Sequence, residues 1–313
     1  MIIQPKPIPI WILTGPTASG KTEVALKIAA HCNAEIVSAD SMLVYRGMDI
    51  GTQKPGHDIR KVIPHHFIDI VDPWEEYNVG RYIREFDTVA RNLYQNGKPF
   101  IVVGGTALYI KAIVNGLFEG PSADWEYRKY LKSLAMEKES DYLHKMLADA
   151  DPETAKKVHE NDQKKIIRAL EVLKLTGSSI SSLQIQFGRK NPLYNCRIVA
   201  IQYDRDVMYK RIEDRVENMF RCGLLNEIKV LLNNPAGLGK QASQALGYKE
   251  VVDFFNQRYT LPEVVAIIKL RTRRFAKRQM TWFRSFSDVH WVHAHADDTV
   301  ACLSEKVLKQ FEK

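Results

Sequence analysis

The stretch Gly15-Pro-Thr-Ala-Ser-Gly-Lys-Thr22 decides the fold, because its glycine and lysine spacing is that of a loop that wraps a chain of phosphates. An apolar, β-prone run over residues 8–14 precedes it, and residues 21–30 follow with helical composition and no helix breaker. The order is therefore strand, glycine-rich loop, helix, which is the context that makes this spacing specific. Backbone N–H groups of such a loop point inward, and the following helix adds the positive end of its dipole.

Individual loop residues have separate roles in this prediction. Lys21 is expected to bind phosphoryl oxygens and the Thr22 hydroxyl to bind Mg²⁺, while Gly15 and Gly20 permit a close approach that a side chain would block. An ordinary strand-to-helix turn is the alternative, which an eight-residue match in this context disfavours. The predicted phosphate-binding residues are Gly15, Pro16, Thr17, Ala18, Ser19, Gly20, Lys21 and Thr22.

Composition places the chain among ordinary globular proteins. The 313 residues are 45% hydrophobic, which supports a sizeable core. The sequence contains no run of about eighteen apolar residues and no signal-peptide pattern, so we expect a cytoplasmic protein with no membrane association. The four cysteines lie far apart, which indicates neither a zinc ribbon nor a disulfide framework. The net charge of +8 is compatible with a polyanionic partner.

Beyond the loop, short apolar runs alternate with amphipathic helices, which predicts an α/β fold with a parallel sheet. The predicted strands cover residues 34–41, 64–71, 99–106 and 197–203, and the predicted helices cover residues 79–94, 107–114, 206–221 and 262–286. Asp40 stands at the far end of its strand, and in open parallel sheets that end faces the ligand crevice. Residues 45–52 are too rich in glycine for a regular helix and are predicted to form a loop against the site.

The character of the chain changes at residues 119–124. From there to about residue 182, apolar residues recur at helical intervals with little strand signal, which predicts an inserted helical domain. The predicted domains are residues 1–118, the first part of the core; residues 119–190, the helical insertion; and residues 191–313, the second part of the core.

Positive charge is concentrated in the predicted helix near the C-terminus. Residues 264–287 contain seven basic side chains and no acidic one: Lys269, Arg271, Arg273, Arg274, Lys277, Arg278 and Arg284. Contact with a phosphate backbone explains this field better than a solvated basic face does. The interleaved aromatic residues Phe275, Trp282 and Phe283 are assigned to packing, because aromatic residues at helical spacing usually belong to the core.

Two smaller basic clusters each have two interpretations. Lys164, Lys165 and Arg168 share a helical face that either grips a substrate or forms salt bridges. Arg211 and Arg215 project from one side of a helix and either bind phosphates or pair with neighbouring carboxylates.

Taken together, these motifs resemble the bacterial-type tRNA dimethylallyltransferases, also called tRNA isopentenyltransferases. The matching segments span nearly the whole chain and cover residues 15–22, 40–55, 102–106, 161–171, 211–215, 245–249 and 276–282. The loop alone fits many nucleotide hydrolases, whereas residues 40–55 are specific to this family. The sequence departs from the family pattern at Leu43, Gln53, Ala107 and Lys165, where glutamine, alanine, glycine and arginine are common.

The resemblance implies a P-loop-containing parallel sheet with an inserted all-helical domain, and transfer of a dimethylallyl group from dimethylallyl diphosphate to N6 of the adenine on the 3′ side of the anticodon. By this resemblance Lys21, the loop amides, Arg215 and a Mg²⁺ ion held partly by Thr22 stabilise the leaving diphosphate. Asp40 is the general base, and Thr106 positions the amine. The residues alone, without this resemblance, fit a role for Asp40 as a Mg²⁺ ligand equally well.

The family pattern also implies which residues contact tRNA. They are Asp40, Ser41, Met42, Leu43, Thr106, Arg128, Lys164, Lys165, Ile166, Ile167, Arg168, Gln244, Ala245, Leu246, Gly247, Tyr248 and Lys249. We expect a monomer. The rival interpretations are a P-loop kinase that uses ATP on a nucleoside or small metabolite, and a non-catalytic RNA-binding module that keeps the loop without its activity.

Overall fold

The computed structural model describes residues 6–117, 120–183 and 190–313, which form two compact units. The core unit comprises Met1–Val114 and Pro192–Lys313, and the helical unit comprises Asn115–Asn191. The domain boundary predicted between residues 118 and 119 lies outside the described residues, and the one predicted between residues 190 and 191 lies one residue before the observed division.

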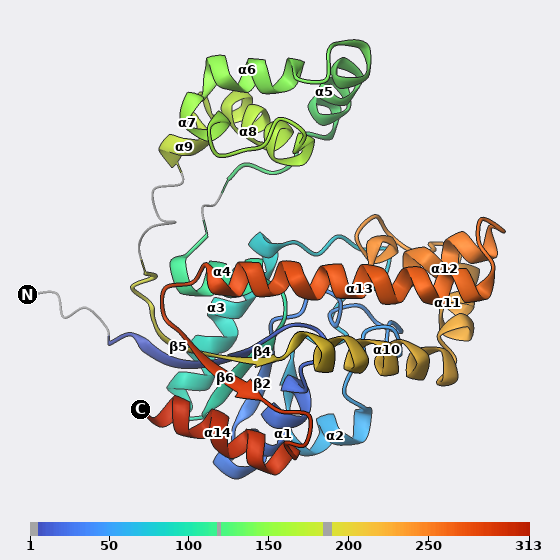
Figure 1. Cartoon of the computed structure of the whole chain (residues 1–313). Coiled ribbons are helices and arrows are strands. Elements are labelled where there is room, and N and C mark those ends of the chain that lie inside the picture. Colours follow the sequence, from blue (N-terminus) through green and yellow to red (C-terminus); the bar gives the residue numbers. More distant parts are fainter. Residues whose placement is uncertain (1–5, 118–119, 184–189) are drawn as a thin grey trace, which may run out of the picture. The chain divides into compact units, whose positions relative to one another are not determined.

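The core unit is built on a sheet of six parallel strands in the order β3-β2-β4-β1-β5-β6 (Figure 1). The strands are β1 (Ile8–Thr14), β2 (Glu35–Ser38), β3 (His65–His66), β4 (Phe100–Gly104), β5 (Tyr194–Tyr203) and β6 (Val289–Ala294). The predicted parallel α/β sheet is confirmed. Because all strands run the same way, the loops after β1, β2 and β4 meet at one edge of the sheet.

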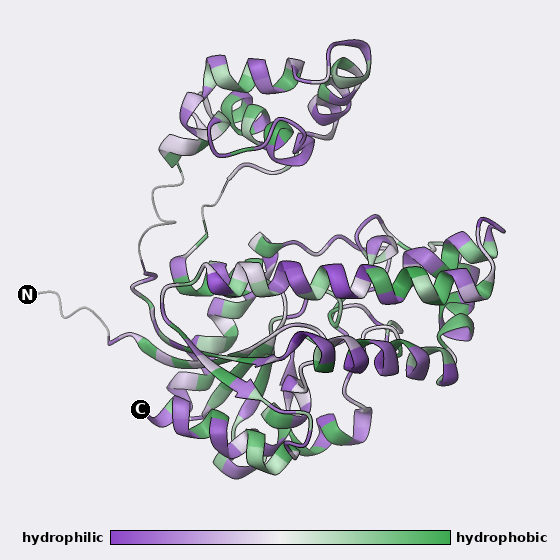
Figure 2. Ribbon diagram, viewed as in Figure 1, coloured by the Kyte–Doolittle hydropathy of each residue, from purple (hydrophilic) through white to green (hydrophobic). Residues whose placement is uncertain are grey.

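Helices cover both faces of the sheet. On one face, α1 (Lys21–Cys32) and α14 (Val300–Glu312) bury a hydrophobic cluster with the strands, and on the other face α3 (Val79–Gln95) and α4 (Ala107–Asn115) bury another. The two-sided burial explains why the central strands β1 and β4 are mostly apolar, whereas the edge strands β3 and β6 carry histidines; Figure 2 shows the hydropathy of each residue.

A group of helices extends the core unit beyond the sheet edge. It consists of α10 (Arg205–Arg221), α11 (Leu224–Asn233), the short 3₁₀ turn η2 (Ala242–Gln244), α12 (Tyr248–Phe255) and α13 (Leu261–Arg284). The long helix α13 runs along α10 and α12 (Figure 1). Asp204 is the N-cap residue of α10, although its side chain makes no capping hydrogen bond.

The predicted strand over residues 64–71 is wrong in its extent, since only His65 and His66 pair with β2. Phe67 and Asp69 adopt positive φ angles of 63° and 56°, which end the extended conformation. The carboxylate of Asp69 then binds Lys54 and Arg60. The chain therefore leaves the sheet here to anchor the neighbouring loop. A short helix, α2 (His57–Val62), separates that loop from β3.

The helical unit contains α5 (Trp125–Glu137), α6 (Tyr142–Ala150), α7 (Pro152–Ala155), α8 (Gln163–Thr176) and α9 (Ile180–Leu183), and no strand lies among its described residues. Its core includes Leu131, Leu143, Leu147 and Leu170. The all-helical character predicted for the insertion is confirmed. In the described part of the chain, no helix is long and apolar enough to cross a lipid bilayer.

Candidate active site

The loop between β1 and α1 has the backbone geometry that its sequence predicts. Gly15 and Gly20 have φ angles of 149° and 77°, values that favour glycine. A Cβ at Gly15 would lie 2.7 Å from the carbonyl oxygen of Ile201 in β5, so a larger residue does not fit there. Helix α1 begins at Lys21, directly after this turn. The glycines therefore bring the loop close to the sheet edge at the start of a helix.

Two side chains from distant helices hold this loop in place. The Gln279 carbonyl oxygen accepts a hydrogen bond of 2.8 Å from the Thr17 N–H, and its amide group donates one of 2.8 Å to the Gly105 carbonyl. Arg211 donates to the Ala18 carbonyl over 2.8 Å. Arg211 thus contacts the loop backbone, and Gln279 is a site residue that the sequence motifs did not predict. The sequence signal for Gln279 is its position as a polar residue on the mostly apolar buried face of α13.

The ends of β2 and β4 meet beside the loop. A Cβ at Gly104 would lie 2.1 Å from the Ala39 carbonyl oxygen, so glycine is required for this approach. Thr106 then fixes the turn after β2: its N–H donates to the Ala39 carbonyl over 3.1 Å, and its hydroxyl accepts from the Ser41 N–H over 2.9 Å. Asp40 accepts a hydrogen bond of 2.9 Å from the Met42 N–H. Asp40 and Thr106 are therefore held in one turn network.

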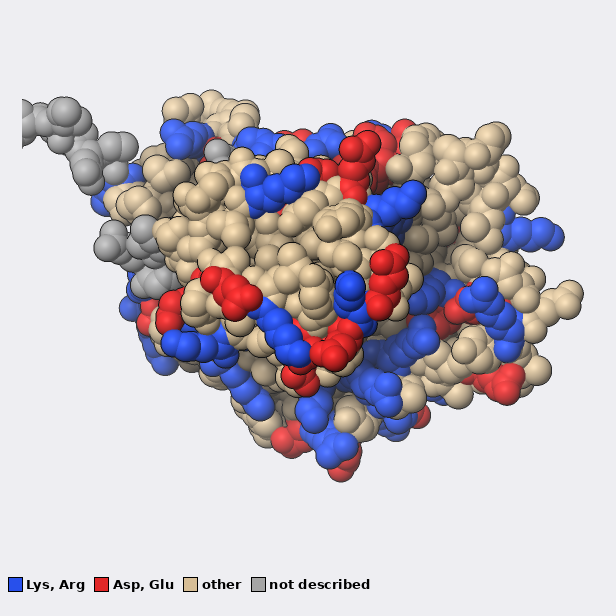
Figure 3. Space-filling model, turned by 90° about the horizontal axis from the view of Figure 1, so that it is seen from above, with Lys and Arg blue, Asp and Glu red and all other residues tan. Residues whose placement is uncertain are grey.

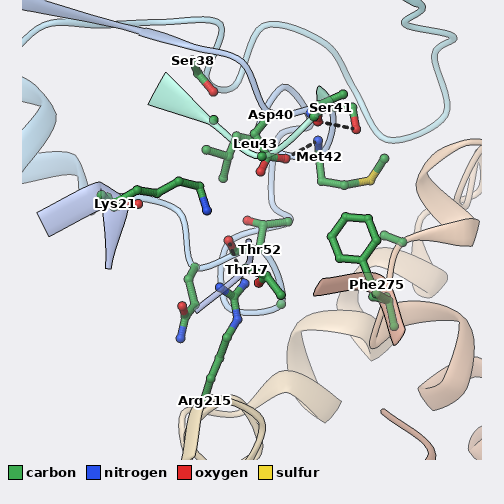
Figure 4. Close-up of a pocket in the computed structure, with 18 of the residues that line it drawn as sticks. Thr17, Lys21, Ser38, Asp40, Ser41, Met42, Leu43, Thr52, Arg215 and Phe275 are labelled. Carbon is green, nitrogen blue, oxygen red and sulfur yellow. Dashed lines mark hydrogen bonds between the residues drawn. The ribbon is translucent and has the colours of Figure 1, made fainter. Parts of the chain in front are cut away.

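These loop and strand ends line a cavity of about 390 Å³ in the core unit (Figure 4). Lys21, Asp40 and Arg215 point into it from α1, the end of β2 and α10. Of the residues predicted to bind phosphate, metal or tRNA, the cavity lining includes Thr17, Lys21, Thr22, Asp40, Ser41, Met42, Leu43, Thr106, Arg215, Gln244, Ala245, Leu246 and Tyr248.

Phe275 also lines this cavity, beside Met42 in Figure 4. Its assignment to core packing is therefore wrong for this ring, whereas the assignment is confirmed for Phe283, which is fully buried. Trp282 is 41% exposed, so it is not a core residue either. Helical spacing alone did not separate a ring that packs in the core from one that faces a cavity.

The cavity favours anions. Burial lowers the pKa of Lys21 to about 8, against the opposing effect of Asp40, and the charge of Arg215 lowers it further. Burial also lowers the pKa of Arg215, again against the effect of Asp40. Two partly buried cations thus face one carboxylate, and a bound anion would relieve the cost of keeping both charged. Among the described residues, no group of three or more His, Cys, Asp and Glu side chains forms a metal site.

Other predicted residues lie behind or beside this lining. Pro16 accepts a hydrogen bond of 3.2 Å from the Lys21 ammonium group, and the buried Ser19 hydroxyl has no hydrogen-bond partner among the described residues. At the start of α12, Gly247 is buried and Lys249 is exposed, with its ammonium group 3.4 Å from Gln244.

The helical unit holds the remaining predicted residues. Arg128 and Arg168 both bind the buried carboxylate of Glu171, over 2.7 Å in each case. Burial by itself would raise the pKa of Glu171, but hydrogen bonds from these two arginines outweigh it and lower the pKa. Both arginines therefore help to hold the helical unit together.

The neighbouring predicted residues of α8 divide between the core and the surface of the helical unit. Ile166 and Ile167 are core residues, so their side chains are not available to tRNA. Lys164 and Lys165 are exposed, and Lys165 pairs with Asp162 over 2.8 Å.

The seven basic residues of α13 divide into two groups. Lys269, Arg271 and Arg273 form ion pairs with Glu217, Glu250 and Glu213. The other four are exposed and form no ion pair with any described residue; they are Arg274, Lys277, Arg278 and Arg284. Figure 3 shows the charged side chains of one face of the molecule, where acidic and basic ones are mixed. For α13 itself, the ion pairs named above are the evidence. Fewer uncompensated positive charges therefore lie on this helix than its sequence predicts, because three of the seven are paired with glutamates.

Solved structures with this fold come from bacteria and from a eukaryote. The full-length tRNA isopentenylpyrophosphate transferase of Bacillus halodurans is 35% identical, with a TM-score of 0.69 over 97% of each chain. A eukaryotic dimethylallyltransferase described as acting on tRNA is 27% identical, with a TM-score of 0.77 over 91% of this chain and 73% of its own.

Sequence relatives agree with the structural ones. The chain is 42% identical to tRNA dimethylallyltransferase 2 of Geotalea uraniireducens over 91% of this chain and 92% of the relative. It is 43% identical to the tRNA dimethylallyltransferase of Pelotomaculum thermopropionicum over 93% of each. Residues 43–286 match the family model described as IPP transferase. The chain therefore belongs to the IPP transferase family, whose relatives here are tRNA dimethylallyltransferases.

Proposed function

We propose that this protein transfers a dimethylallyl group from dimethylallyl diphosphate to N6 of the adenine 3′-adjacent to the anticodon of a tRNA and releases diphosphate. One observation carries the proposal: Lys21, Arg215 and Asp40 face one cavity beside the phosphate-binding loop. A cradle for a leaving anion and a base for the incoming amine are the two groups that an alkyl transfer of this kind requires.

The cations of the cavity act on the leaving group. As the bond between the allylic carbon and the diphosphate oxygen breaks, charge develops on that oxygen. A unit charge at about 4 Å contributes roughly 4 kcal/mol at an effective dielectric constant near 20. Lys21, Arg215 and the loop N–H groups that have no partner among the described residues supply this stabilisation; Pro16 has no N–H, and the Thr17 N–H is taken by Gln279. Gln279 and Arg211 hold the loop in position for this role.

The site fits a Mg²⁺ ion that binds mainly to the diphosphate. Thr22 lines the cavity at the start of α1 and offers a hydroxyl oxygen, and Asp40 lines the same space, so the available donors are the hard oxygens that Mg²⁺ prefers. When bound, Mg²⁺ neutralises part of the charge on the leaving diphosphate.

Asp40 accepts the proton that the adenine amine loses as its nitrogen bonds to the allylic carbon. The hydrogen bond from the Met42 N–H holds one carboxylate oxygen, which leaves the other oxygen for the amine. Thr106 orients this turn through the Ser41 N–H and lines the same cavity as Asp40. The proton then passes from Asp40 to solvent.

The target adenine has to leave its stack to reach this cavity. Residues 41–43 and 244–249 would surround it in the core unit, with Phe275 as an additional aromatic face for stacking. In the helical unit, Lys164, Lys165, Arg128 and Arg168 would contact the anticodon arm. Glu171 occupies part of each guanidinium, and the Pro121 carbonyl accepts a further bond of 3.0 Å from Arg168. The N–H groups that remain are those we assign to the RNA. We expect the enzyme to act as a monomer in the cytoplasm.

The test is mass spectrometry of tRNA nucleosides after incubation with dimethylallyl diphosphate and Mg²⁺, for the wild type and for Asp40→Ala. The wild type is expected to form the prenylated adenosine, and D40A to lose roughly 10²–10⁴-fold in rate while it keeps tRNA affinity. Asp58→Ala, at an exposed carboxylate on α2, is the matched control and retains the wild-type rate.

Two other results would contradict the proposal and indicate a different function. Use of labelled ATP by the wild type without prenyl transfer would indicate a kinase. Binding of tRNA by the wild type with no transfer in any condition would indicate a non-catalytic RNA-binding module.

A further inference from the structure

Glu227 of α11 does not line the cavity, yet its carboxylate receives hydrogen bonds from two segments that do. One oxygen accepts from the N–H groups of Asp49 and Ile50 over 3.0 and 2.6 Å. The other accepts from the Gly51 N–H over 3.2 Å and from the Tyr248 hydroxyl over 2.6 Å. Four donors thus converge on one side chain, and charge-assisted bonds of this type are the strong ones.

The two segments that Glu227 joins form one wall of the cavity. Gly51, Thr52 and Gln53 line it from the loop, and Tyr248 lines it from α12. They also touch each other closely: a Cβ at Gly51 would lie 2.3 Å from the Tyr248 ring. Burial, followed by the charge of Glu227, raises the pKa of Tyr248 well above its usual range, so its hydroxyl remains a donor.

This wall contacts one of the proposed catalytic groups. The Thr52 carbonyl accepts a hydrogen bond of 3.5 Å from the Arg215 guanidinium, and Figure 4 shows the two residues facing each other. We propose that Glu227 is a positioning residue, which holds the loop over residues 49–52 so that Thr52 directs Arg215 at the diphosphate. This inference rests on the function proposed above.

The rest of the loop has a separate anchor, so the effect of Glu227 is local. The Lys54 ammonium group, whose side chain is 1% exposed, donates to the Tyr45 carbonyl over 2.7 Å and pairs with Asp49 and Asp69. When Glu227 is removed, these contacts keep the ends of the loop in place. Within the loop, only the backbone N–H groups of residues 49–51 then lose their acceptor, the Glu227 carboxylate.

The decisive variant is Glu227→Gln, which keeps the size of the side chain but turns an NH₂ group toward donors. With saturating substrates, kcat is expected to fall about 10–100-fold, while the affinity for tRNA changes by less than about twofold. Glu227→Asp keeps the charge and is expected to recover part of the rate. Glu263→Gln is the matched control, because Glu263 also accepts a hydrogen bond from a backbone N–H, that of Thr260 at the start of α13. This variant is expected to keep the wild-type kcat.

A double-mutant cycle with Tyr248→Phe separates positioning from general stability. Tyr248→Phe removes one of the four donors and is expected to lower kcat a few-fold. Because both side chains act through the same carboxylate, the double variant E227Q/Y248F is expected to be no slower than E227Q.

Several outcomes would overturn the inference. Suppose that the wild type transfers the prenyl group and that folded E227Q has the same kcat. Glu227 then does not position the site, even if the melting temperature of E227Q is lower than that of the wild type. If E227Q does not fold, wild-type kcat values in both E227D and Y248F overturn it. A wild type without transfer activity would instead contradict the proposed function.

Discussion

At the scale of single residues, the site depends on a lysine that is costly to keep charged. Burial lowers the pKa of Lys21 to about 8, against the effect of Asp40. The unfolded chain therefore binds this proton more tightly than the folded one. The resulting penalty on stability is present below about pH 8 and disappears as the pH rises toward the ordinary value of 10.5.

The same shift predicts how diphosphate binding depends on pH. Binding requires the charged lysine, so the affinity for inorganic diphosphate with Mg²⁺ is expected to fall as the pH rises through about 8. Isothermal titration calorimetry between about pH 7 and 9.5 measures this fall. Diphosphate itself titrates in this range, so the comparison is with Lys21→Met, which is expected to bind weakly with a flatter profile.

Lys27→Gln is the control for this comparison, because Lys27 is an exposed lysine of the same helix and its loss leaves the wild-type profile unchanged. A profile for K21M as steep as that of the wild type would contradict the assignment of the pH dependence to Lys21.

At the scale of elements, α13 combines three functions on one helix. Its buried face carries Gln279, which holds the phosphate-binding loop, and Phe275 lines the cavity. Its exposed face carries basic side chains without an ion-pair partner among the described residues, such as Arg274 and Lys277. The helix thus joins the phosphate site to the surface that we assign to the RNA backbone.

This division predicts unequal contributions of the basic residues to tRNA binding. Arg274→Gln and Lys277→Gln are each expected to reduce the slope of log K against log salt by roughly 0.7–1, with little change in transfer at saturating tRNA. Lys269→Gln, whose charge Glu217 already compensates, is expected to change the slope less. Filter binding at a series of salt concentrations measures the slopes, and equal slopes for wild type and all three variants would remove α13 from the RNA interface.

Local patterns predicted the elements that depend on local rules. The strand, loop and helix over residues 8–32 and the stripe of α3 follow from turn chemistry and periodicity. The extent of β3 could not be predicted from such local patterns. Phe67 and Asp69 adopt positive φ angles there, and Asp69 forms ion pairs with Lys54 and Arg60 outside the strand. Helices α11, α12 and α14 were not predicted.

The residues of the site show the same limit. Lys21, Asp40, Thr106 and Arg215 were identified by motif, and the structure brings all four to one cavity. Gln279 and Glu227 were not assigned, since their partners lie 262 and up to 178 positions away. Periodicity can mark Gln279 as a polar residue on a mostly apolar helix face, but it does not identify partners at such separations.

At the scale of the whole molecule, the two units have separate hydrophobic cores. The core unit buries clusters on both faces of its sheet, whereas the described residues of the helical unit form one small cluster with ten buried members. A small core with few buried side chains opens more readily than a large one. The amides of α5, α6 and α8 are therefore expected to exchange with solvent faster than those of β1 and β4.

Because each unit has its own hydrophobic core, hydrogen exchange can distinguish the ligands of the two units. If the helical unit contacts the anticodon arm, a tRNA stem-loop at about 100 times its Kd stabilises that unit by roughly 2.7 kcal/mol, which slows exchange about 100-fold. Dimethylallyl diphosphate with Mg²⁺ is expected to protect only the core unit, around α1. The double variant Lys164→Gln and Lys165→Gln is expected to lose most of the RNA-dependent protection of the helical unit while it keeps that of the core unit. Protection by RNA that is confined to the core unit would show that the insertion does not bind the anticodon arm, and the tRNA contacts would then rest on the cavity rim and α13.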